Sequence, residues 1–197
     1  MLRCRWALVC TGTIFNQPIL PPIIEPDHDV CRAQKQTLVY LPFESSSAVL
    51  SVLQRSPERF IFHCGDLEPG IYGNVRVRGF SRDGFKHSLH TCDGVICNAG
   101  FELASEALSL GRKLMVKPLK GQMEQSSNAL ALEQLGLALS VTEISETTVQ
   151  QFFATAQRRH IAYPDVPALL ADWLTRYPEQ SLDALVSRAW QGIALPT

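Results

Sequence analysis

Short apolar runs alternate with amphipathic segments over most of the chain. Each apolar run is four or five residues long and carries few charges, which is typical of strands buried on both faces of a sheet. We expect about six such strands, at residues 37–41, 60–64, 75–78, 94–97, 113–117 and 137–141.

Between and after these runs, apolar residues recur every three or four positions, a spacing that places them on one face of a helix. Helices are predicted at residues 48–54, 81–91, 101–110, 124–135, 147–158, 167–177 and 181–190, and the stretch 147–193 as a whole is expected to be helical. Buried strands that alternate with helices indicate a parallel sheet covered on both faces. The predicted fold class is therefore α/β, a Rossmann-like doubly wound parallel sheet with a helical C-terminal extension.

The first 35 residues lack this alternation. Four prolines stand between positions 18 and 26, and proline both fixes the backbone and removes a hydrogen-bond donor. Residues 1–35 are therefore predicted to be a linker-like segment, and residues 36–197 to form one domain that includes the C-terminal helices. The apolar run at residues 6–10 is too short to span a bilayer, and no later run approaches the roughly 20 residues needed, so we expect a cytoplasmic chain without a transmembrane segment.

Charge and cysteine content narrow the function classes. Eighteen Lys and Arg residues against nineteen Asp and Glu give a net charge of −1, which offers no basic field to hold a nucleic acid. The six cysteines form no CxxC pair and are expected to be reduced thiols. A zinc site would have to use His63, Cys64, His87, His90 and Cys92, whose spacing matches no common ligand pattern.

One loop carries the chemistry expected of a phosphate site. Gly100 directly follows the strand at 94–97, and the helix that it opens presents unpaired N–H groups and a positive dipole end. Glu106 lies farther along that helix and could accept hydrogen bonds from two adjacent hydroxyls, as ribose offers. On local chemistry alone, a turn glycine and a helix-dipole or surface carboxylate are the preferred explanation of the two residues.

A second loop follows the strand at 113–117. It ends in Glu124-Gln125 at the start of a helix, where a carboxylate beside an amide suits sugar hydroxyls. Taken alone, the pair is also an ordinary polar helix N-terminus.

The two loops and their helices together show a pattern whose members are Gly100, Ser105-Glu106-Ala107-Leu108, Gly111, Pro118, Gly121-Gln122, Glu124-Gln125, Asn128-Ala129 and Gly136. This pattern resembles the C-terminal, nucleotide-sugar-binding half of the GT-B glycosyltransferases, most of all relatives of the peptidoglycan N-acetylglucosaminyltransferase and the uridine-diphosphate (UDP) glycosyltransferases. The resemblance covers roughly residues 37–141. The segment 78–81 is similar to the family segment before the motif, and Thr11-Gly12 with the prolines that follow is similar to the family's interdomain linker.

The resemblance implies a site for the nucleoside diphosphate. The backbone around Phe80 would meet the uracil ring, and the backbone of Ala99, Gly100 and Phe101 would face the diphosphate. Glu106 matches the carboxylate that holds the ribose.

The resemblance also implies a site for the donor sugar. Glu124 and Gln125 match the acid–amide pair that reads the sugar hydroxyls, and Asn128 either supports that loop or is an ordinary helix amide. The segment 42–46 replaces the family's more usual glycine-rich turn. Its Ser45 and Ser46 either donate hydroxyls there or cap the next helix.

The implied activity is that of a donor-binding domain, which holds a nucleotide-diphosphate sugar, UDP-linked by resemblance, for hexosyl transfer to an acceptor. No essential metal or other cofactor is expected, and no residue can be nominated as the catalytic base; His87 and His90 are expected on an exposed helix face. A complete GT-B enzyme has two such domains, so the chain resembles the donor half alone. It would be a fragment, or a natural half that works with a separate acceptor subunit, as in the two-subunit N-acetylglucosaminyltransferase of the dolichol pathway.

Other functions remain open at this stage. A nucleotide-sugar epimerase could use the same framework, and so could a non-catalytic remnant that binds a nucleotide or a partner. A dinucleotide-dependent dehydrogenase is disfavoured because no GxGxxG follows the first strand. An exposed surface where the second domain would dock could also drive self-association.

Overall fold

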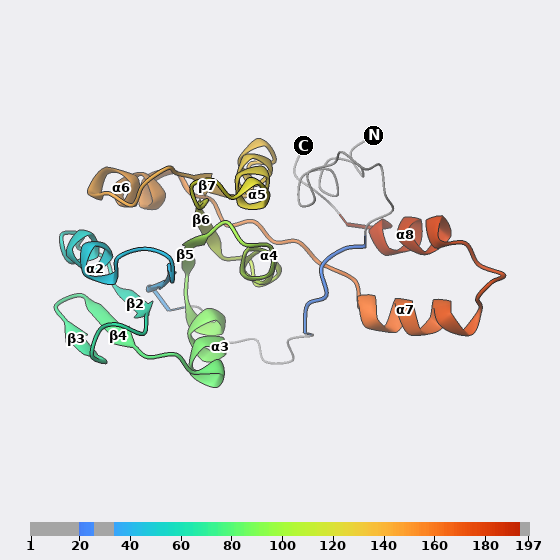
Figure 1. The fold of residues 1–197 in the computed structure, drawn as a ribbon, viewed down its shortest axis with the longest axis horizontal. Coiled ribbons are helices and arrows are strands. Elements are labelled where there is room, and N and C mark those ends of the chain that lie inside the picture. Colours follow the sequence, from blue (N-terminus) through green and yellow to red (C-terminus); the bar gives the residue numbers. More distant parts are fainter. Residues whose placement is uncertain (1–19, 26–33, 194–197) are drawn as a thin grey trace.

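The computed structural model describes residues 20–25 and 34–193. The predicted linker-like segment and the resemblance at Thr11-Gly12 therefore lie largely outside the described residues, as do three of the six cysteines. The remainder folds as a sheet with helices on both faces (Figure 1).

The sheet has seven strands in the order β3-β4-β2-β1-β5-β6-β7. All neighbouring strands run parallel except β3, which pairs antiparallel with β4. The strands are β1 (Thr37–Tyr40), β2 (Phe60–His63), β3 (Gly70–Tyr72), β4 (Val75–Arg78), β5 (Gly94–Asn98), β6 (Lys113–Lys117) and β7 (Leu139–Ser140). This confirms the α/β class and the sheet of about six strands; the additional strand is the short edge strand β3, which was not anticipated.

Within residues 20–25 and 34–193, seven helices connect and extend the sheet: α2 (Ser46–Gln54), α3 (Arg82–Thr91), α4 (Phe101–Ser109), α5 (Met123–Gln134), α6 (Glu146–Thr155), α7 (Val166–Thr175) and α8 (Leu182–Trp190). One apolar core lies between the sheet and α3, α4 and α5, and contains Leu89, Ala107 and Leu132. A second core lies between the opposite face and α2 and α6, and contains Leu53 and Phe152. Helices on both faces explain why the strands consist of nearly uninterrupted apolar residues.

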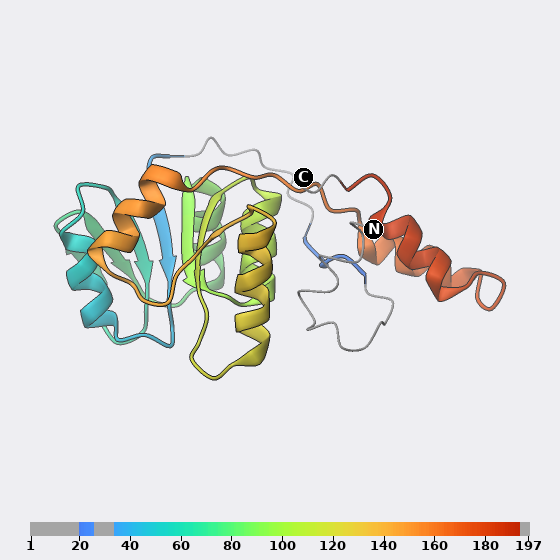
Figure 2. The same ribbon diagram turned by 90° about the horizontal axis from the view of Figure 1, so that it is seen from above.

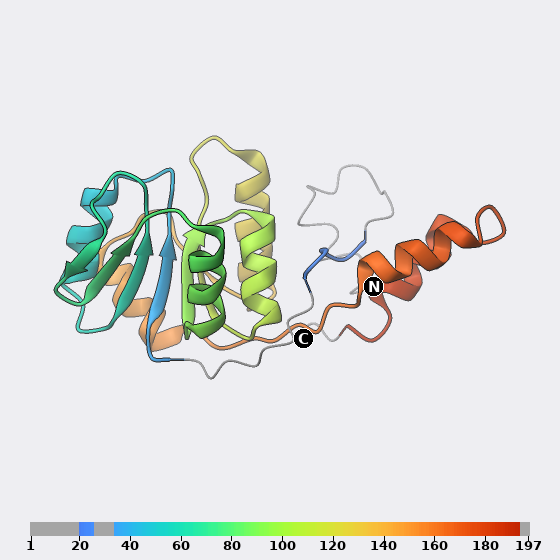
Figure 3. The same ribbon diagram turned by 90° about the horizontal axis from the view of Figure 1, so that it is seen from below.

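The C-terminal region is less helical than expected. Helix α6 ends at Thr155, and residues 156–165 run extended, with Arg158 in an antiparallel bridge to Lys113 and the Ile161 N–H bonded to the Leu108 carbonyl oxygen. The expectation of continuous helix over 147–193 is therefore wrong, because this stretch uses its backbone donors on the sheet and on α4. Helices α7 and α8 then form a hairpin that projects from the sheet (Figures 2 and 3).

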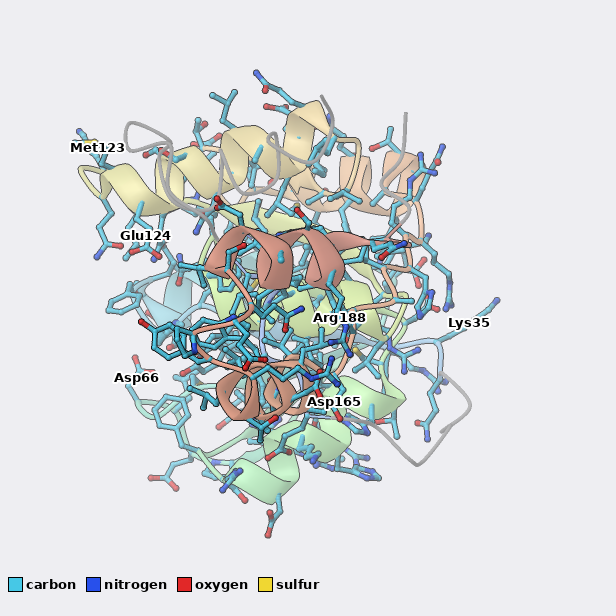
Figure 4. All side chains as sticks on the ribbon, turned by 90° about the vertical axis from the view of Figure 1, so that its right-hand side faces the viewer. Lys35, Asp66, Met123, Glu124, Asp165 and Arg188 are labelled. Carbon is cyan, nitrogen blue, oxygen red and sulfur yellow. The ribbon has the colours of Figure 1, made fainter. Side chains whose placement is uncertain are left out.

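The strand order reverses direction at β1. The chain moves outward from β1 through β2 to β4, returns across the sheet to β5 on the other side of β1, and then continues outward through β6 and β7. A doubly wound sheet has its binding crevice at such a reversal, at the carboxyl ends of the strands. Figure 4 shows that edge, with Asp66, Met123 and Glu124 on one side of the molecule and Lys35, just before β1, on the opposite side.

Candidate functional site

The beginning of α4 is open toward the carboxyl edge. Gly100 is its N-cap residue and supplies no side-chain cap, and a Cβ built on Gly100 would meet no atom within 4 Å among the described residues. The Ala99 N–H already donates to the Lys117 carbonyl oxygen and the Gly100 N–H to that of Asn98. The amides left to face an anion are therefore those of the first helical turn, beginning at Phe101, rather than those of Ala99 and Gly100.

Lack of a side-chain cap distinguishes the two helices at the expected site. In the part of the chain that the structure describes, α2, α3, α6, α7 and α8 each begin with a serine or aspartate side chain that accepts a backbone N–H. Helices α4 and α5 begin without one. Uncapped N-termini leave unpaired amides and a positive dipole end, which are the elements of an anion site.

Glu106 lies on α4 as a half-buried carboxylate. Its side-chain carboxylate has no hydrogen-bond or ion-pair partner within residues 20–25 and 34–193, and only its backbone oxygen accepts hydrogen bonds. Burial raises the pKa of its carboxyl, the negative charges of Glu102 and Glu25 raise it further, and Lys86 acts in the opposite direction. A desolvated carboxylate beside like charges does not stabilise the fold. Such groups are concentrated at functional sites.

Phe80 follows β4 and leaves its ring on the surface of the carboxyl edge. The ring is 62% exposed and contacts Tyr40, at the end of β1, edge to face with 6.2 Å between centroids. A Cβ on Gly65, just after β2, would lie 2.7 Å from the Phe80 ring. The glycine thus makes room for an exposed aromatic ring above the ends of β1 and β2, where a flat ligand could stack.

Of the three expected site residues on α5, one has an exposed side chain and two are buried. Glu124 is exposed at the start of the helix (Figure 4). The buried Gln125 accepts the Leu119 N–H with its side-chain oxygen at 3.0 Å, and the buried Asn128 donates to the Ala99 carbonyl oxygen at 3.1 Å. Gln125 therefore holds the β6–α5 loop, and Asn128 ties α5 to the loop in front of α4.

An ion pair that the sequence did not reveal crosses the same edge. Lys117, the last residue of β6, contacts Glu44, in the loop after β1, with 2.5 Å between Nζ and Oε1. The side chains are only 15% and 22% exposed. In the same loop Ser45 accepts the Ala48 N–H and caps α2, so helix capping is its role here.

The zinc hypothesis finds no support in the geometry. Residues 20–25 and 34–193 contain no group of three His, Cys, Asp or Glu side chains placed to share a metal ion. His63 is buried against Ser88 instead, with 3.0 Å between Nε2 and Oγ. Burial raises the pKa of the Cys92 thiol to about 11 and that of Cys97 to about 12, which disfavours the thiolate form of both.

Comparison with known proteins identifies the family. The family model described as "Glycosyl transferase family 1" matches residues 11–156, about three quarters of the chain. The chain belongs to glycosyl transferase family 1. An uncharacterized glycosyltransferase of Methanosarcina acetivorans is 36% identical over 67 residues, which cover 34% of this chain and 17% of that protein.

Solved structures confirm the family's fold. The kitacinnamycin glycotransferase is similar with a TM-score of 0.54 and 18% identity, over 87% of this chain and 45% of that one. A "ugt transferase" from Siraitia grosvenorii in complex with UDP is similar with a TM-score of 0.50 and 16% identity, over 63% and 37%. The chain spans less than half the length of each of these relatives, and it has the fold of one half of a GT-B glycosyltransferase.

No helix within the described residues is both long and apolar enough to cross a membrane.

Proposed function

We propose that this chain is the donor-binding half of a glycosyltransferase and holds a nucleotide-diphosphate sugar, UDP-linked, at the carboxyl edge of its sheet. Membership of glycosyl transferase family 1 supports the class of reaction. The similar structure from Siraitia grosvenorii is a complex with UDP, which supports the choice of uridine. The acceptor and the catalytic base would come from a second domain or subunit.

The single observation that carries the proposal is Glu106. Within the described residues, no hydrogen-bond or ion-pair partner reaches this half-buried carboxylate, whose pKa is raised and which stands six residues after the glycine that opens α4. Two adjacent ribose hydroxyls would supply the donors that this carboxylate lacks. The uncapped first turn of α4 would then face the diphosphate, where its dipole favours the negative charge that develops on the leaving group.

The other predicted residues take roles that fit this arrangement. The exposed Phe80 ring offers a surface for the base, and exposed Glu124 offers acceptors to the sugar. Gln125 and Asn128 would act mainly by holding the two loops in position, because their polar atoms already bond to loop backbone. We include a cytoplasmic location in this proposal, which the free buried thiols of Cys64, Cys92 and Cys97 support.

Calorimetric titration with UDP tests the proposal. The wild-type chain should bind UDP, and Glu106→Gln should weaken binding about tenfold or more, because hydrogen bonds to an ionised carboxylate are lost. Glu133→Gln is the matched control, since Glu133 is an exposed carboxylate at the far end of α5. A folded chain that does not bind UDP would refute the proposal, and equal affinities of wild type and Glu106→Gln would remove the ribose role of Glu106.

A further inference from the structure

The Glu44–Lys117 ion pair lies across the crevice at the strand reversal. Glu44 belongs to the loop after β1 and Lys117 ends β6, while β5 separates these two strands in the sheet. The pair must therefore pass over the end of β5, directly beside the turn that opens α4 at Gly100.

The direction of the lysine side chain follows from the alternation along β6. Met115 packs into the core formed with α2 and α6, and Lys117, two residues later, points to the same face. The α2 helix begins at that edge behind its Ser45 cap. The ammonium group thus lies at the carboxyl end of the sheet, on the face that α2 covers, where it contacts Glu44.

The charges around the crevice show why a cation is needed there. The helix α4 that would face a diphosphate carries two carboxylates, Glu102 in its first turn and Glu106. Lys86 acts on Glu106, and the helix dipole adds a partial charge of only about one half of an elementary charge to compensate the ligand's phosphates. A lysine removed from solvent, in contrast, supplies a full charge that water screens only weakly.

Stabilisation of the fold is not by itself a sufficient explanation for burying Glu44 and Lys117 as an ion pair. Taking two charges out of water carries a large desolvation penalty, which their mutual attraction only roughly offsets. Glu44 belongs to the loop that follows β1 at the carboxyl edge of the sheet. Glu44 thereby places a carboxylate close to where a ligand phosphate would approach.

We propose that Lys117 is the positive counter-charge for the donor diphosphate, and that Glu44 occupies the lysine as a substitute anion until the donor binds. This inference rests on the proposed function, since it assigns a further residue to the same site. On binding, the ammonium exchanges its hydrogen bond from the Glu44 carboxylate to a phosphate oxygen, and the Glu44 carboxylate turns toward water. During glycosyl transfer the same ammonium would stabilise the charge that collects on the departing diphosphate.

The test compares UDP with uridine, which lacks phosphates, in calorimetric titrations of the wild type and Lys117→Met. Lys117→Met should lose about tenfold or more in affinity for UDP, because a hydrogen bond from a charged donor is removed, and should bind uridine as the wild type does. Lys113→Met is the matched control, because Lys113 lies on the same face of β6 at its opposite end. It should leave both affinities unchanged.

The partner residue provides an independent arm. Glu44→Gln should bind UDP as tightly as the wild type or more tightly, because the lysine no longer has a competing carboxylate. If Lys117→Met does not fold because Glu44 is left partly buried without its partner, the double variant Glu44→Gln/Lys117→Met removes both charges and should show the same selective loss of UDP affinity.

The outcomes separate this inference from the proposed function. Undiminished UDP affinity in a folded variant that lacks Lys117, or an equal loss of UDP and uridine affinity, would overturn the role of Lys117 and leave the proposed function standing. A loss of UDP affinity in Glu44→Gln as large as that in Lys117→Met would show that the pair acts only as a structural unit. Failure of the wild-type chain to bind UDP would refute the proposed function and this inference with it.

Discussion

Gly94 lets the central strand β5 begin against a buried aromatic ring. A Cβ at this position would lie 2.7 Å from Cζ of Phe152 and 3.3 Å from Cβ of Lys113. Phe152 is fully buried on α6, and β5 is hydrogen-bonded to β1 on one side and to β6 on the other, so neither can move away freely. Overpacking of this kind costs about 1–3 kcal/mol, so Gly94→Ala should lower the free energy of unfolding by that amount.

Chemical and thermal unfolding, followed by far-ultraviolet circular dichroism, measures this effect. For a chain of this size the expected loss corresponds to a fall in Tm of about 2–12 °C. Phe152→Leu removes the ring atoms in question, so Gly94→Ala should cost less than about 0.5 kcal/mol in that background. Gly79→Ala is the control, because its Cβ would meet nothing closer than 4.0 Å among the described residues. An equal cost of Gly94→Ala in both backgrounds would show that the Phe152 ring is not what opposes the added methyl group.

Three further predictions concern buried polar groups. Burial holds the pKa of His63 below its ordinary value of 6.5, so its contribution to stability is complete above pH 6.5 and is lost as the pH falls toward that lowered pKa. Between pH 7.5 and 5.5 the urea midpoint should therefore fall more for the wild type than for His63→Gln, and parallel curves would contradict this. The pKa of Glu106 is raised, so its ionised form destabilises the unliganded fold at pH 7, and Glu106→Gln should increase the urea midpoint at pH 7 but not at pH 4. Asn128→Ala leaves the Ala99 carbonyl oxygen without its side-chain donor and should cost about 1–3 kcal/mol in urea unfolding, whereas a loss below 0.5 kcal/mol would show that the bond does not hold the loop.

Local patterns predicted those elements whose burial is uniform along their length. The strand 113–117 was predicted with its observed bounds, because three buried apolar residues stand between two lysines and a proline follows. Helix α2 begins one residue after Ser45, as the run of serines indicates. The positions of the two loops at the carboxyl edge then followed from strand direction alone.

The features that sequence patterns missed depend on contacts between distant residues. Strand β3 has three residues, two of them exposed, so it carries no apolar signal and exists because it pairs with β4. The helix predicted over 147–158 ends early because Arg158 pairs with Lys113. Glu44 and Lys117 are 73 residues apart, and only the strand order brings them together.

Chemical-shift mapping of UDP binding on the isotope-labelled chain is the sharpest test of a donor site at the carboxyl edge of the sheet, because it locates the ligand as well as detecting it. We expect saturable shifts that are largest at the backbone amides of Phe101, Glu102 and Leu103, where α4 begins. The amides of Lys35 and Lys113, on the opposite edge of the sheet, should change little. Saturable shifts confined to that opposite edge, or to the α7–α8 hairpin, would contradict it.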